Sequence, residues 1–154
     1  MSHRLYPVSD DPNMPLPVTL DRLELVVRQL GGSLEKVEGE EAAITTFDAV
    51  NFLLSFGSGG KFLSVRAIWA TELNASQDLL MAIFTAADSW NREKYFPTLY
   101  NLIVDNQVEI VADFICPIEC GLSDPQLLDN LAAAIATGVD AIQYMHQATQ
   151  SVTG

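Results

Sequence analysis

Apolar residues recur along this chain at two different spacings, and the spacing separates expected helices from expected strands. Over 19–30 they recur every three to four residues, and the same helical spacing returns after Ser76 and after Ser123. Over 42–71 and 98–116 apolar residues alternate with polar ones, as they do in strands. The pattern predicts the order helix, three strands, helix, two strands, helix. The expected fold is an α+β domain with three helices and an antiparallel sheet of five strands.

Turn residues place the connections between these elements. The glycine-rich turn Gly57-Ser58-Gly59-Gly60 separates expected strands at 50–56 and 61–71, and Asp105-Asn106 lies within the second strand pair. A weaker strand is expected over 42–48, before the first of these turns. The glycine-rich turn lacks the Gly-Lys-Ser/Thr ending of a phosphate-binding loop, so we interpret it as a hairpin turn.

Each expected helix has recognisable ends. Thr19 and Ser76 are N-cap residues, and Ser123 with Gln126 forms a capping box for a last helix that runs to about Thr149. Gly138 within that helix would allow close contact with a strand or a second helix. The residues expected on the buried stripe of the middle helix are Leu80, Ile83, Phe84, Ala87 and Trp90. Asn91 is expected to cap the end of the same helix.

The alternation also sorts the strand residues into two faces of the sheet. The core face is expected to hold Phe52, Leu54, Phe56, Leu63, Val65, Ala67 and Trp69. The opposite face mixes polar and apolar residues, so something should cover its apolar part. The candidate partner-binding residues on this second face are Leu53, Phe62, Arg66 and Ile68.

Length and composition indicate one domain. The chain has 154 residues, of which 49% are hydrophobic and 18% charged, a composition that supports a folded core. Residues 1–18 contain four of the seven prolines, and we expect a flexible arm there, followed by a single domain over 19–150. The chain contains no apolar run long enough to cross a membrane and no signal-peptide core, so we expect it in the cytoplasm.

Charge narrows the classes of partner. The net charge is −12, from 20 acidic and 8 basic residues. Such a surface repels phosphate backbones and anionic lipids, so we expect neither nucleic-acid nor membrane binding. The acidic residues are scattered, which is typical of a surface selected for solubility. Steering of basic partner segments is the alternative interpretation.

The sequence offers few candidate catalytic or metal-binding residues. The two cysteines, Cys116 and Cys120, are expected to be reduced thiols, because a bridge between them needs a tight turn at Pro117. A zinc site would need two further ligands, and the only histidines are His3 and His146. We therefore expect no catalytic residues, no metal and no cofactor.

Several segments together resemble a known family. These are Asp88-Ser89-Trp90-Asn91, Tyr95-Phe96-Pro97, Leu102 to Asp113 across the Asp105-Asn106 turn, Gly121-Leu122-Ser123, and the strand Phe62 to Trp69. Over residues 19–148 the chain resembles the YbjN family of bacterial proteins, described as sensory-transduction regulators. The resemblance implies a fold like that of the small dimeric chaperones of type III secretion. It implies no enzymatic activity and no cofactor.

Two hypotheses for function follow. The first is a non-enzymatic protein-binding module, chaperone-like or a regulatory adaptor in bacterial signalling or stress response. The second is a small-molecule-binding protein or an enzyme without a recognised motif, with a pocket lined by Cys116 and Tyr95 or Tyr100. The first is favoured because enzymes usually show clustered His, Cys or acidic groups. We also expect a homodimer, formed near Gly138 or through the second sheet face.

Overall fold

The structure, a computed structural model, describes residues 11–153 and comprises three helices and six strands. The helices are α1 (Leu20–Gln29), α2 (Gln77–Glu93) and α3 (Asp124–Thr153). The strands are β1 (Glu35–Lys36), β2 (Ala42–Phe47), β3 (Val50–Gly57), β4 (Phe62–Asn74), β5 (Thr98–Val104) and β6 (Gln107–Pro117). Apart from β1, the predicted elements are all present and in the predicted order.

The strands form one antiparallel sheet in the order β1-β2-β3-β4-β6-β5. The prediction of five strands was wrong, because Glu35 and Lys36 pair with Ile44 and Ala43 and add β1 at one edge. Two exposed charged residues are too few to show a period of two, so this strand has no sequence signal. The fold class, α+β with an antiparallel sheet and three helices, is confirmed. Likeness to secretion chaperones stays a prediction.

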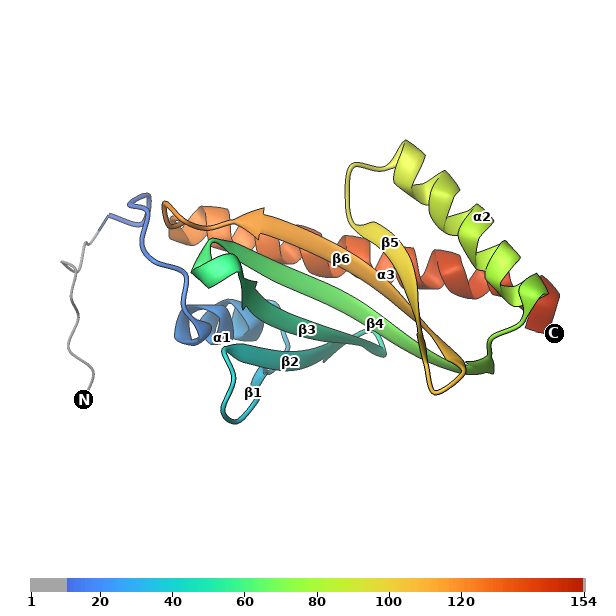
Figure 1. Ribbon diagram of the computed structural model, residues 1–154. Helices are drawn as coiled ribbons and strands as arrows, with labels where there is room; N and C mark the ends of the chain where they lie inside the picture. Colours follow the sequence, from blue (N-terminus) through green and yellow to red (C-terminus); the bar gives the residue numbers. More distant parts are fainter. Residues whose placement is uncertain (1–10, 154) are drawn as a thin grey trace.

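All three helices pack on the same side of the sheet. Figure 1 shows α3 running along the sheet, with α1 near one end of it and α2 near the other. The core between helices and sheet contains the predicted face of β3 and β4, together with one face of β6. Its fully buried side chains include Phe52, Leu54, Leu63, Val65, Ile110, Leu131 and Met145. The other side of the sheet carries no helix among the described residues.

The predicted N-caps of the three helices and the Asp105-Asn106 turn are confirmed. Thr19 accepts the Arg22 amide, and Ser76 accepts the Leu79 amide. The capping box is complete, because Ser123 N–H donates to Gln126 Oε1 at 2.9 Å and Gln126 N–H donates back to Ser123 Oγ at 3.3 Å. The Asp105-Asn106 turn has positive φ at both residues (51° and 65°), which these residue types tolerate.

Gly138 lets α3 approach the sheet. A Cβ at this position would lie 2.7 Å from Cε1 of Phe52 and 3.2 Å from Cβ of Ala67. The prediction of close contact with a strand is therefore confirmed. Gly138 itself is buried against its own sheet, and a homodimer through the last helix near it stays a prediction.

Two predictions about α2 were wrong. Phe84 is 67% exposed, and the buried stripe instead runs through Leu79, Ile83, Ala86 and Ala87. Asn91 does not cap the helix; its carboxamide bonds both backbone groups of Leu99 on β5. A capping preference and a tertiary contact use the same side-chain groups, so sequence cannot separate them.

Part of the expected N-terminal arm contacts the domain. Residues 1–10 lie outside the described residues. In the segment before α1, Leu16 forms an antiparallel bridge with Leu122, and the Arg22 side chain binds the carbonyls of Leu16 and Pro17. How freely the arm moves stays a prediction.

Candidate protein-binding site

The four candidate partner-binding residues lie together on the side of the sheet away from the helices. Leu53 on β3 lies opposite Arg66 on β4, and Ile68 and Phe62 lie further along β4 on the same face. Phe62 is 38% exposed, while Leu53, Arg66 and Ile68 are half-buried. We call this surface, from β2 to β5, the outer sheet face.

A polar group lies at the centre of the outer sheet face. Asp113 on β6 is buried, although it lies on the side without helices. It accepts a hydrogen bond from Ser64 Oγ at 2.7 Å and from Arg66 Nε at 3.1 Å. The neighbouring side chains therefore satisfy this carboxylate. Arg66 remains 41% exposed, so part of its side chain is accessible from this face.

Apolar side chains surround this polar group. The register places Ile44 beside Leu53 on one side, and Ile68 beside Val111 on the other. Further exposed apolar residues on the same face are Ile44 at 45%, Leu102 at 46% and Ile115 at 59%. A hollow of about 490 Å³ opens here, and its lining includes Ile44, Leu53 and Ile68. A group of exposed apolar side chains beside a hollow is typical of a binding site.

Tyr100 borders the central group from β5. Burial raises the pKa of its hydroxyl, and the nearby carboxylates of Asp113 and Glu109 act in the same direction, while Arg66 opposes them. At neutral pH the side chain is a neutral phenol that can donate a hydrogen bond. Sequence reasoning missed Tyr100 and Asp113 as members of this surface. The alternation of β6 could have found Asp113, because its neighbours Ala112 and Phe114 lie on the core face.

The pocket proposed for a small molecule does not form as predicted. Cys116 pairs with Leu63 and points into the core, whereas Tyr100 pairs with Val111 on the outer sheet face. Tyr95 is fully exposed in the loop before β5. The three residues are therefore not brought together.

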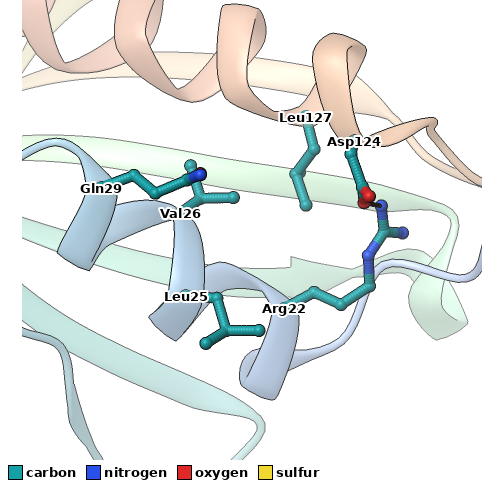
Figure 2. Close-up of a pocket in the computed structure, with 6 residues that line it drawn as sticks. All are labelled: Arg22, Leu25, Val26, Gln29, Asp124 and Leu127. Atoms are coloured by element: carbon teal, nitrogen blue, oxygen red, sulfur yellow. Dashed lines mark hydrogen bonds and ion pairs between the residues drawn. The ribbon is translucent and has the colours of Figure 1, made fainter. Parts of the chain in front are cut away.

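A second hollow of about 310 Å³ lies between α1 and the start of α3 (Figure 2). Arg22 reaches across it and donates to Asp124 at 2.9 Å and to the Leu122 carbonyl at 3.0 Å. The same guanidinium holds the segment before α1, as described above. Its donors are thus occupied in joining three parts of the chain, which assigns Arg22 a structural role.

The described residues hold no cluster of metal-binding side chains. No group of three or more His, Cys, Asp or Glu side chains is placed to hold a metal ion in this part of the chain. His146 lies on α3, stacked on Trp69 at 3.6 Å between ring centroids, so it is on the other side of the sheet from Ser64 and Asp113. Within the same described range, no helix is long and apolar enough to cross a membrane.

Comparison with known proteins identifies one family. The family model for YbjN, described as "Putative bacterial sensory transduction regulator", matches residues 19–147. Among curated proteins, no sequence matches the chain. The crystal structure described as that of YbjN, "a putative transcription regulator from E. coli", superposes with a TM-score of 0.64 at 12% identity. The match covers 91% of this chain and 96% of the E. coli chain, so it shows a shared fold.

Proposed function

The chain belongs to the YbjN family, and from that premise we propose that it is a non-enzymatic protein-binding module acting as a regulatory or chaperone-like adaptor. In this proposal, the outer sheet face holds a segment of a partner protein. The family description, sensory transduction regulator, is in keeping with a protein that acts by binding. A cytoplasmic location is part of the proposal, because both cysteines are free thiols.

The observation that carries the proposal is the composition of the outer sheet face. In a one-sided antiparallel sheet, the solvent side is normally polar. Here Leu53, Ile68 and Phe62 lie on that side, and the first two line a hollow. Arg66, which is half-exposed, pairs with Leu53. Apolar area removed from water contributes roughly 25 cal/mol per Å², so covering this surface would favour association.

The test is capture of partners by a tagged chain from its own cells after mild crosslinking, read by mass spectrometry. Ile68→Asp places a charge at the edge of the hollow and should abolish capture of the dominant partner. Changing Arg66 would be less informative, because it would also leave the buried carboxylate of Asp113 without its ion pair.

The matched control is Leu25→Asp, which introduces the same charge at an exposed leucine on α1, away from the sheet. This variant should capture the partner as well as wild type does. Thermal unfolding of both variants should stay cooperative. Unchanged capture by a folded Ile68→Asp variant would refute the outer sheet face as the binding surface.

A further inference from the structure

β5 is the last strand of the sheet, so one of its two edges has no neighbouring strand (Figure 1). In an antiparallel pair, successive residues point their backbone groups alternately toward and away from the partner strand. The backbone N–H and C=O of Leu99 point away from β6, because both bond the side chain of Asn91. By the same alternation, Asn101 and Ile103 also point their backbone groups outward.

Asn91 shows how this edge accepts a neighbour. Its Oδ1 accepts the Leu99 N–H at 2.8 Å, and its Nδ2 donates to the Leu99 carbonyl at 2.8 Å. A carboxamide has the same donor and acceptor as a peptide group. The side chain therefore takes the place of one residue of an additional strand. It stops at Leu99, at the beginning of β5.

The remainder of the edge is open. No described residue supplies a hydrogen-bond partner for the outward backbone groups of Asn101 and Ile103. The side chains at this end of β5 are apolar and about half exposed: Leu102 at 46%, Ile103 at 53% and Val104 at 50%. Free backbone groups between exposed apolar side chains are what a pairing strand requires.

The opposite edge of the same sheet, formed by β1, lacks the length and the apolar side chains of β5. β1 consists only of Glu35 and Lys36, and both are exposed and charged. Short length and charge are the usual means by which proteins block unwanted strand pairing. β5 has neither protection, since Thr98–Val104 contains no charged residue and no proline.

We propose that the free edge of β5 binds an extended, apolar segment of another protein that carries lysine or arginine, and that this segment pairs with Asn101 and Ile103 as a seventh strand. The charge of the partner follows from the hairpin itself. The charged residues of 98–117 are Asp105, Glu109 and Asp113, and this range contains no basic residue. Arg66 neutralises Asp113. The carboxylates of Asp105 and Glu109, near the end of β5 where the edge is open, have no ion-pair partner among the described residues.

A second copy of this chain is disfavoured as the occupant. Stable dimers bury about 1,200–2,000 Å² in total, more than pairing along Asn101–Val104 alone supplies. A second copy would also bring a second chain of net charge −12 against this edge. A basic segment gains attraction where a second copy meets repulsion.

The probe is a fluorescein-labelled peptide, Lys-Thr-Val-Ile-Val-Thr-Lys, titrated with the full chain and followed by fluorescence anisotropy. Ile103→Pro removes one outward N–H without breaking the β5–β6 ladder, and proline is tolerated at such edge positions. We expect it to weaken peptide binding at least about tenfold. Ile103→Thr is the matched control: it keeps the N–H and should bind within about threefold of wild type.

Two further peptides keep the native chain unchanged, so the test does not depend on the folding of a variant. N-methylation of alternate peptide amides should abolish binding, and exchange of both lysines for glutamates should weaken it about tenfold. Equal binding of the methylated peptide, no binding at about millimolar concentration, or self-association through β5 would overturn the proposal.

Ile68→Asp should bind the peptide like wild type. Loss of binding in that variant would instead place the peptide on the outer sheet face.

Discussion

At the scale of single residues, Asp113 illustrates how a carboxylate is kept on a largely apolar surface. An unpaired buried charge is costly, and this one is compensated by the Ser64 hydroxyl and the Arg66 guanidinium. The Arg66 side chain remains partly exposed beside this pair. A partner carboxylate could bind there without disturbing the buried pair, which would give the surface specificity as well as apolar area.

The two thiols should react at very different rates. Cys120 is exposed, whereas Cys116 is buried and its pKa is raised by that burial. Because the thiolate is the reactive form, a disulfide reagent at about pH 8 should modify Cys120 quickly and Cys116 at least about tenfold more slowly. The rate at Cys116 should keep rising with pH above the ordinary range for a thiol, because burial raises its pKa. Equal rates in the native protein would contradict the placement of Cys116 in the core.

The same pKa shift has a consequence for stability. The folded pKa of Cys116 lies above that of the unfolded chain, so folding favours the neutral thiol. Its contribution to the free energy of unfolding is complete below the unfolded pKa and is lost as pH rises through the folded pKa. Urea unfolding of wild type and Cys116→Ala at increasing alkaline pH isolates this contribution, which the variant should lack.

At the scale of elements, the contact between α3 and the sheet depends on Gly138. In Gly138→Ala the new methyl group would overlap the Phe52 ring, at a cost of about 1–3 kcal/mol, while the gain in helix propensity is about 1 kcal/mol. We expect the free energy of unfolding to fall by about 1 kcal/mol, measured by urea denaturation.

A second background tests this explanation of the Gly138 effect. In Phe52→Leu the side chain that would clash is smaller, so Gly138→Ala should be neutral or stabilising there. The same loss in both backgrounds would mean that the ring of Phe52 is not what limits the approach of α3 to β3.

Asn91 joins two elements that the sequence presents separately. It lies near the end of α2, and its carboxamide fixes the first outward position of β5. The Trp90 indole adds a bond to the Pro97 carbonyl at 2.9 Å. Adjacent residues at the end of one helix thus place the following strand, and they set the point from which the free edge begins.

At the scale of the whole molecule, the predicted homodimer and the proposed partner compete for one surface. Gly138 itself is packed internally, and the outer sheet face is the other of the two dimer surfaces expected from sequence. Light scattering at tens of micromolar should give twice the 16.8 kDa of one chain if the dimer forms. A mass of one chain would show the dimer prediction to be wrong.

The Ile68→Asp variant separates the remaining cases. A dimer in both wild type and variant would leave the outer sheet face free for a partner. A wild-type dimer that this substitution converts to a monomer would instead assign the face to a second copy, and the proposed partner site would be wrong. The same sample therefore tests assembly and function together.

Local patterns were sufficient for much of the fold. The caps at Thr19, Ser76 and Ser123, the turn at Asp105-Asn106 and the two faces of β3 and β4 depend on neighbours in the sequence, and all are confirmed. The two-residue alternation of side chains along a strand also placed Leu53, Phe62, Arg66 and Ile68 correctly on one face, because the pleat of a strand is a local property. Whether a partner occupies that face stays a prediction.

Other features could be read only from the folded chain, because they depend on contacts between segments that are distant in sequence or too short to carry a pattern. These include the pairing of β1, the exposure of Phe84, the burial of Asp113 by Arg66 and Ser64, and the bonds from Asn91 to Leu99. Local pattern was enough to predict which elements form and which side chains share a face, because backbone geometry fixes the repeat of each element. It could not determine which edge stays open, because strand order arises from packing that no local repeat encodes.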